Sequence, residues 1–165
     1  MKIAIFSDLH DDWQNLKIFL NYCKLNQIKD LLFCGDLSKE ETLEYLATNF
    51  IGRIYLVGGN ADLFEDKKVK KYPNIIYQKD VLIFKFDELK IIAVHRPKEL
   101  KEILEKNNEK FEFAFHGHTH QPVFKKNQQL IISNPGTLSG PPFQASFSIL
   151  DSKKKILELK ILSKI

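Results

Sequence analysis

Cysteine is scarce in this chain, with only Cys23 and Cys34 among 165 residues. The two stand in unlike contexts and form no C-x-x-C spacing, which argues against a disulfide framework and against a structural zinc site built on cysteines. Cys34 ends an apolar run, where a small buried thiol packs well. Neither cysteine is therefore expected to carry a disulfide bond or a zinc ion.

Long apolar runs are also missing. No stretch approaches the roughly 20 apolar residues that a membrane-spanning helix needs. The N-terminal segment MKIAIFSDLH reaches an aspartate too early to contain the apolar centre of a secretory signal. We expect a soluble, cytoplasmic protein with no membrane partner.

Arginine is nearly absent, because Arg53 and Arg96 are the only two and lysine supplies most of the positive charge. The formal net charge is +4, which permits an anionic partner without requiring one. The lysine runs EDKKVKKY and DSKKKI contain no interleaved aromatic residues of the kind that stack on bases. A solvated lysine surface is favoured over nucleic-acid binding, although a nucleic acid is chemically a phosphodiester.

The remaining composition is that of an ordinary globular protein, with 44% hydrophobic and 12% aromatic residues. A chain of this length suffices for one core and is short for two, so we expect residues 1–165 to form a single domain. Short β-rich runs alternate with helical patterns, which predicts an α/β fold.

Apolar residues at helical spacing predict three helices, over residues 12–26, 38–49 and 97–108. Asp11 or Asp12 is the expected N-cap of the first helix. Ser38 is the expected N-cap of the second, with Glu41 completing a capping box. Pro97 suits the first position of the third helix, where no N–H donor is needed.

The β-rich runs predict the strands. These runs are residues 2–7, 30–34, 53–58, 74–78, 81–86, 89–94, 111–115, 123–133, 143–151 and 155–162. The runs 74–78, 81–86 and 89–94 are expected to be neighbouring strands, with a turn at FDEL between the last two. The run 123–133 reads as a hairpin closed at Lys126-Asn127.

Polar residues with oxygen or nitrogen donors follow five of the apolar runs. They are Asp8-Leu9-His10, Gly35-Asp36, Gly59-Asn60, His95 and Gly117-His118-Thr119-His120. Continuous apolar runs suit strands that are buried on both faces. The carboxyl ends of such strands line a binding crevice, so we expect these donors to converge there.

Each of these pieces alone has an ordinary structural explanation. An aspartate after a strand commonly caps a helix, a glycine permits a positive φ, and an asparagine commonly serves a turn. A lone histidine is more often a surface residue than a ligand. Their combination favours a metal site, because two aspartates, one asparagine and four histidines follow the predicted strands in regular order.

The order and spacing of these motifs resemble the calcineurin-like metallophosphoesterase family. The motifs cover positions 8 to 120, and the stretch NPGT at 134–137 resembles a further feature of the small single-domain phosphodiesterase branch. The resemblance implies a four-layer α-β-β-α sandwich of two mixed β-sheets. It also implies hydrolysis of a phosphate ester, in the first place a phosphodiester.

A two-metal centre is part of what the resemblance implies. One ion would be held by Asp8, His10 and His120, the other by Asn60, His95 and His118, and Asp36 would bridge the two. Asp36, Asn60 and His95 are also expected to be catalytic. Carboxylate, imidazole and amide donors suit Mn²⁺, Fe, Zn²⁺ or Ni²⁺ better than Ca²⁺, and Mn²⁺ is the first expectation. Two such ions present a bridging hydroxide for in-line attack at phosphorus.

Three positions beside the motifs are less regular. Arg96 stands where the family usually has glycine, and it is either a surface arginine or a fork for a substrate phosphate. Ala61 replaces a histidine proposed to protonate the leaving group, so the general acid is Asp62, another group or water, unless the leaving group is itself acidic. His116 has no role in the family pattern and is expected to be structural or to orient a ligand.

The runner-up function is a non-catalytic scaffold with this fold, as in the small retromer subunit. The departures at Ala61 and Arg96 keep that alternative open, whereas the seven intact ligand positions favour an enzyme. The segment GDLSKEETLE contains no arginine soon after Asp36 to grip phosphate, which speaks against a protein phosphatase. The chain is also too short for a cap domain, so we expect broad substrate acceptance.

Overall fold

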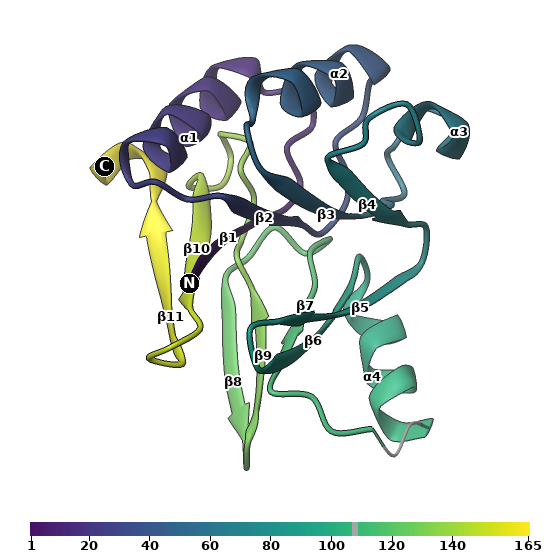
Figure 1. Cartoon of the computed structure of the whole chain (residues 1–165), viewed down its shortest axis with the longest axis vertical. Coiled ribbons are helices and arrows are strands. Elements are labelled where there is room, and N and C mark those ends of the chain that lie inside the picture. The colour runs from purple at the N-terminus through teal and green to yellow at the C-terminus, as the bar shows by residue number, and fades with distance from the viewer. Residues whose placement is uncertain (107–108) are drawn as a thin grey trace.

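Two mixed β-sheets lie face to face at the centre of the protein, seen in a computed structural model that describes residues 1–106 and 109–165 (Figure 1). The six-stranded sheet has the order β11 (Ile156–Ile161), β10 (Ser146–Asp151), β1 (Lys2–Phe6), β2 (Asp30–Phe33), β3 (Arg53–Val57), β4 (Ile75–Gln78). The five-stranded sheet has the order β5 (Val81–Phe86), β6 (Leu89–Val94), β7 (Phe113–Phe115), β9 (Leu130–Asn134), β8 (Val123–Asn127).

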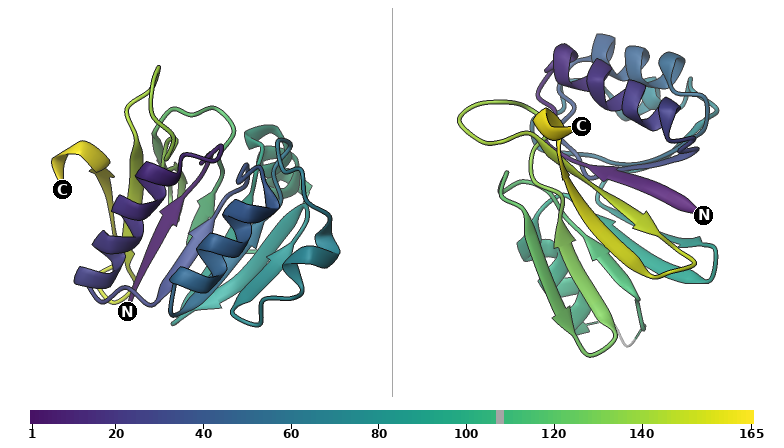
Figure 2. Two further views of the ribbon diagram at one scale, coloured as in Figure 1. Left: turned by 90° about the horizontal axis from the view of Figure 1, so that it is seen from above. Right: turned by 90° about the vertical axis from the view of Figure 1, so that its left-hand side faces the viewer.

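Helices cover the outer faces of both sheets. α1 (Trp13–Leu25) and α2 (Glu40–Asn49) run side by side across the six-stranded sheet, with the short α3 (Asp66–Val69) beyond them (Figure 2). α4 (Pro97–Lys106) packs on the five-stranded sheet, and a 3₁₀ turn (Leu162–Lys164) follows β11. The four layers confirm the predicted α-β-β-α sandwich.

Hydrophobic packing fills each of the three spaces between layers. Phe6, Phe19 and Phe33 pack between the six-stranded sheet and its helices, with ring centroids 4.6 and 4.5 Å apart. Ile5 and Phe115 belong to the core between the sheets, which also contains the buried thiol of Cys34. A third cluster lies under α4. Strands β1 and β2 are therefore buried on both faces, as their continuous apolar runs predict.

Parallel pairing brings the functional strand ends to one edge. β1, β2, β3 and β4 run parallel in the first sheet, and β6, β7 and β9 run parallel in the second. In the first sheet α1 and α2 make the crossovers between successive strands. The carboxyl ends of β1, β2 and β3 therefore face those of β6 and β7 across the sandwich.

The cap of α2 differs from the prediction. The helix begins at Glu40 with Lys39 in the cap position, and Ser38 has a φ of 86° and caps nothing. The capping box with Glu41 therefore does not form, and this prediction is wrong. Asp11 instead binds the first turn of α2 through its side chain, because its Oδ1 accepts the Lys39 N–H at 3.1 Å and the Thr42 hydroxyl at 2.6 Å. For α1, Asp12 is the N-cap and accepts the Asn15 N–H at 3.0 Å.

Three other details of the predicted elements change. β4 is not a neighbour of β5: it pairs with β3, because Ile75 and Tyr77 pack on the helix-side core, and the chain then crosses to the second sheet. The β8–β9 hairpin turns at 128–129 and not at 126–127. β7 begins at Phe113, later than expected.

Other predicted elements are confirmed. The turn between β5 and β6 lies at 87–88, and β10 and β11 form the final hairpin. The predicted end of the third helix, at 107–108, lies outside the described residues. No helix in the described part of the chain is long and apolar enough to cross a membrane.

The cap supplied by Asp11 leads to a stability prediction. Asp11→Ala is expected to lower the free energy of unfolding by about 1–2 kcal/mol, because α2 loses its side-chain cap. Ser38→Ala is the matched control and should change it by less than about 0.5 kcal/mol. Urea denaturation followed by circular dichroism measures both, and equal losses would return the capping role to Ser38.

Candidate metal centre

The loops after five strands come together at one edge of the sandwich and are joined by backbone hydrogen bonds. The Asp8 N–H donates to the Gly35 carbonyl at 2.9 Å, which joins the loops after β1 and β2. The Gly117 N–H donates to the His95 carbonyl at 3.0 Å, which joins the loops after β7 and β6. The predicted ligands are carried by these loops and by the loop after β3.

Asp8, His10 and His120 form a first group, in which one ligand atom of each lies within 4.8 Å of the others. The Nε2 atoms of His10 and His120 are 3.1 Å apart, and His120 Nε2 is 3.3 Å from Asp8 Oδ1. With both Nε2 atoms unprotonated, a cation between these three atoms would stabilise the arrangement.

Asp36, His95 and His118 form a second group with the same spread of 4.8 Å. His95 Nδ1 lies 2.8 Å from the Cys34 carbonyl oxygen, which can only accept, so Nδ1 carries the proton. His95 Nε2 then faces the group, 3.3 Å from Asp36 Oδ2 and 3.0 Å from Asn60 Oδ1. A second proton or a metal cation can hold three such electron-rich atoms together.

Asp36 faces both groups. Its Oδ2 lies 3.9 Å from His10 Nε2 and 3.3 Å from His95 Nε2, while its Oδ1 accepts the Ala61 N–H at 2.7 Å. Burial opposes ionisation, but a protonated His95 and the hydrogen bond from the Ala61 N–H outweigh it and hold the pKa of Asp36 below its usual value. Asp36 is therefore a carboxylate with one oxygen directed between the two groups.

Asp8 is fully buried and is held by the second sheet. Both of its oxygens lie 3.1 Å from the backbone N–H of His118. Burial raises the pKa of Asp8 to about 6, although a hydrogen bond from Ser7 and the nearby His95 lower it in part. A cation beside this carboxylate would offset the cost of its burial.

Backbone strain is concentrated at the predicted ligands. Five of the seven have φ in the left-handed region, between 47° and 69°: Asp8, His10, Asp36, His118 and His120. For a residue other than glycine this conformation costs roughly 1–2 kcal/mol. Strain of this kind persists where surrounding contacts enforce it, and it is concentrated at functional sites.

Two of the motif glycines are required by close packing. A Cβ on Gly59 would overlap the backbone nitrogen of Asp36, and one on Gly117 would overlap the Ser7 hydroxyl. Gly35 alone of the three has a positive φ, of 95°. The expectation that these glycines permit positive φ therefore holds only for Gly35.

The other candidate residues, His116, Asp62 and Arg96, lie outside both groups. His116 is buried, its Nδ1 lies 3.0 Å from the Gly117 carbonyl oxygen, and it lines a groove between α4 and the β8–β9 hairpin. Asp62 accepts the N–H groups of Leu37 and Gly59, both at 2.7 Å, so it ties two loops together. Arg96 is half exposed, with Nη1 3.7 Å from Glu99.

The NPGT motif supports the ligand loops, a role that reading the sequence did not assign. Asn134 Nδ2 donates to the Gly117 carbonyl at 2.9 Å and to the Thr119 hydroxyl at 3.0 Å. The Thr137 hydroxyl donates to the Asp8 carbonyl at 2.6 Å. The NPGT motif is the feature of the sequence that could have indicated this supporting role. Phe143 lies against His120 with ring centroids 5.5 Å apart, and no pattern pointed to it.

The donors of both groups fit divalent transition metals. Each group combines a carboxylate with two imidazoles, a set that suits Zn²⁺, Mn²⁺ or Fe. The Asn60 amide oxygen lies 3.0 Å from His95 Nε2 of the second group, and Asp36 Oδ2 lies 3.9 Å from His10 Nε2 of the first. The chemistry and the geometry are thus consistent with two cations.

Metal binding gives a thermal-shift prediction. Mn²⁺ at 100 times its Kd should stabilise the protein by about 2.7 kcal/mol, and EDTA should remove this gain. His118→Ala should lose most of the metal-induced shift, because it removes a donor of the second group. His116→Gln is the matched control and should keep the shift, even if its own melting temperature falls. Loss of the shift in His116→Gln would show that His116 is itself a ligand.

Comparisons with known proteins identify the family of this chain. The sequence profile of the calcineurin-like phosphoesterase superfamily domain matches residues 1–155. A phosphodiesterase of Methanocaldococcus jannaschii is 26% identical over an alignment of 163 positions that covers 94% of this chain and 95% of the relative.

Solved structures extend the likeness over the whole fold. The structure of an archaeal phosphodiesterase is 25% identical, with a TM-score of 0.86 over 98% of this chain and 99% of the other. Vps29 of Entamoeba histolytica, solved with Zn²⁺, shares the fold at 17% identity, with a TM-score of 0.71 over 98% and 99% of the two chains. On the family match and the arrangement of its strand-end residues, the chain belongs to the calcineurin-like phosphoesterase superfamily.

Proposed function

We propose that this protein is a metal-dependent phosphodiesterase that hydrolyses its substrate at a centre of two divalent cations. Asp8, His10 and His120 would hold one cation, and Asn60, His95 and His118 the other, with Asp36 between them. Mn²⁺ is our first choice of metal, ahead of Fe, Zn²⁺ and Ni²⁺. A single domain over residues 1–165 and a cytoplasmic location stay predictions.

The observation that carries this proposal is the position of Asp36 Oδ2. One oxygen atom lies 3.9 Å from a histidine nitrogen of the first group and 3.3 Å from one of the second. A carboxylate is suited to this place, because its charge reduces the repulsion between two dications. The phosphodiesterase relatives support the choice of a diester over other phosphate esters.

The bound cations would supply Lewis-acid activation of water and of the phosphoryl oxygens for in-line displacement. The chain positions the groups around them. The Cys34 carbonyl oxygen lies 2.8 Å from His95 Nδ1 and favours the tautomer in which Nε2 carries no proton. The Ala61 N–H and the His118 N–H orient the two carboxylates Asp36 and Asp8. This support keeps the donors in place before a substrate arrives.

Neither Ala61 nor Asp62 is well suited to donate a proton to the leaving group. Ala61 has only a methyl side chain, and its N–H is used by Asp36. The Asp62 carboxylate accepts hydrogen bonds from three backbone N–H groups, those of Leu37, Ser38 and Gly59. These bonds stabilise its charged form and fix it between the loops after β2 and β3. Burial nevertheless raises the pKa of Asp62, and these bonds offset that in part. We therefore expect leaving groups that depart without protonation to react faster.

Removal of the shared carboxylate tests the function directly. Asp36→Asn should lower kcat/KM for bis(p-nitrophenyl) phosphate with Mn²⁺ by roughly 10²–10³-fold, because the negative charge between the cations is lost. Asp151→Asn, at the turn between β10 and β11, is the control for a lost aspartate and should retain activity. A wild-type protein that binds Mn²⁺ but hydrolyses no phosphate ester would instead support a scaffold, the function suggested by Ala61.

Leaving-group dependence forms a separate test. The wild type should hydrolyse an aryl phosphodiester far faster than an alkyl one. Ala61→His should raise the alkyl rate about tenfold or more by supplying a general acid, with little change in the aryl rate. Rates for both ester types are measured by product release. Equal wild-type rates on the two esters would show that a proton donor is already present.

Arg96 is proposed as a contact for the substrate phosphate. It lines the cavity that also contains Asn60 and His95, and its ion pair with Glu99 at 3.7 Å is weak. Arg96→Ala should raise KM about tenfold with a small change in kcat, as expected for one charge-assisted contact. Lys98→Ala removes a nearby positive charge outside that cavity and is the control. Steady-state kinetics with unchanged KM for Arg96→Ala would exclude this role.

A further inference from the structure

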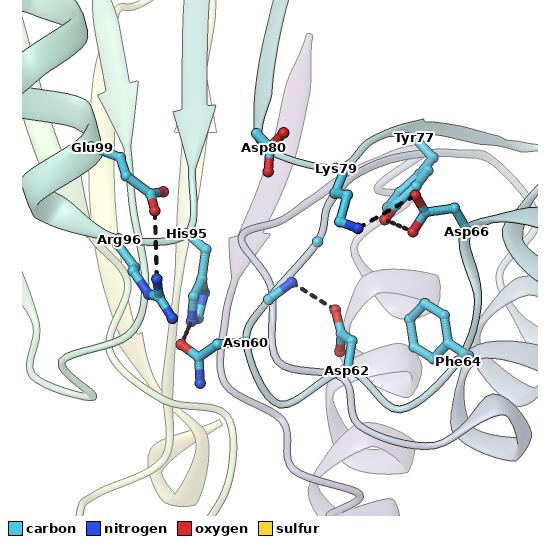
Figure 3. Close-up of a pocket in the computed structure, with 12 residues that line it drawn as sticks. Asn60, Asp62, Phe64, Asp66, Tyr77, Lys79, Asp80, His95, Arg96 and Glu99 are labelled. Carbon is cyan, nitrogen blue, oxygen red and sulfur yellow. Dashed lines mark hydrogen bonds and ion pairs between the residues drawn. The ribbon is translucent and has the colours of Figure 1, made fainter.

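A small cavity of about 230 Å³ opens beside the second metal group (Figure 3). Asn60 and His95 form part of its wall, and the opposite wall comes from residues 62–66 and 77–80. Because two proposed ligands line it, a phosphate held at the metal centre would lie next to it. Its volume is below the roughly 300–1,000 Å³ of pockets for drug-sized ligands, so it suits a small substituent better than a lipid chain or an oligonucleotide.

The cavity has an excess of negative charge. Its charged side chains are Lys79 and Arg96 against Asp62, Asp66, Asp80 and Glu99. Each of the two basic side chains already faces a carboxylate: Lys79 Nζ is 4.0 Å from Asp66, and Arg96 Nη1 is 3.7 Å from Glu99. The proposed metal cation on Asn60 and His95 would offset this charge at its own wall, so a positive substituent would be attracted toward the opposite wall, where Asp66 and Asp80 lie.

Asp80 is the carboxylate available to a ligand. Within residues 1–106 and 109–165 its exposed carboxylate has no hydrogen bond or ion pair, and Figure 3 shows it between Glu99 and Lys79. Asp62, by contrast, is occupied by backbone N–H groups. An unpaired charge there can contact a ligand without first breaking a bond.

Two aromatic side chains, Phe64 and Tyr77, complete the cavity. They lie on the side opposite Arg96 in Figure 3. The Tyr77 hydroxyl donates to Asp66 at 2.8 Å, which holds its ring in place. A ring face attracts an ammonium group by about 0.5–2 kcal/mol, depending on its exposure. Aromatic rings and a free carboxylate together favour an organic cation.

We propose that this cavity binds one ester substituent of the phosphodiester, and that this substituent is a small alcohol carrying an ammonium group. Asp80 provides the charge, and Phe64 and Tyr77 provide apolar surface. The inference rests on the proposed function, because the metal centre has to hold the phosphate for the substituent to enter.

Two p-nitrophenyl diesters test the proposal with Mn²⁺ present. One carries a choline substituent, and the other carries 3,3-dimethylbutyl, its uncharged isostere. The wild type should prefer the choline ester about tenfold in kcat/KM. Asp80→Asn should reduce that preference at least threefold. Glu88→Gln removes the same charge at the far end of β5 and should leave the preference unchanged.

The failures of the two proposals can be told apart. Equal kcat/KM for both esters in the wild type, or an unchanged preference in Asp80→Asn, overturns the cavity assignment and leaves the phosphodiesterase standing. If neither ester is hydrolysed, the proposed function fails, and calorimetric binding of the same two diesters to the Mn²⁺-loaded protein decides the cavity. Tighter binding of the choline ester that Asp80→Asn weakens supports it, whereas equal binding or none overturns it.

Discussion

Hydrogen bonds from backbone N–H groups to three aspartates hold the candidate site together. Asp8 accepts the His118 N–H, Asp36 accepts the Ala61 N–H, and Asp62 accepts N–H groups from the loops after β2 and β3. A hydrogen bond to a charged group contributes about 1.5–3 kcal/mol, roughly twice a neutral one. Four of the five loops that carry predicted ligands are thereby fastened to another such loop, and the fifth, after β6, is joined by the Gly117 N–H to the His95 carbonyl.

These bonds also explain the strained backbone. Asp8, Asp36 and His118 are in the left-handed region, and each takes part in one of the bonds just described. The left-handed turn directs the side chain toward the crevice while the strand before it continues straight into the core. A regular extended residue at these positions would direct its side chain along the sheet normal instead.

The sequence predicts the candidate site better than it predicts some of the elements around it. The ligand positions follow from strand ends and donor chemistry, both of which are local. The cap of α2 is different, because Asp11 reaches it from a loop 28 residues before Lys39. The partner of β4 likewise depends on which core receives Tyr77. Such contacts join distant parts of the chain and leave no local pattern.

Each of the two donor groups draws on both sheets. Asp8 and His10 come from the first sheet and His120 from the second, while Asp36 joins His95 and His118 across the same gap. A cation in either group would act as a cross-link between the halves of the sandwich, closing a loop of more than a hundred residues between His10 and His120. Both cysteines of this chain are free, so such ions would supply the cross-links that disulfide bonds supply in secreted domains. The affinity for metal would then depend on how closely the two sheets pack.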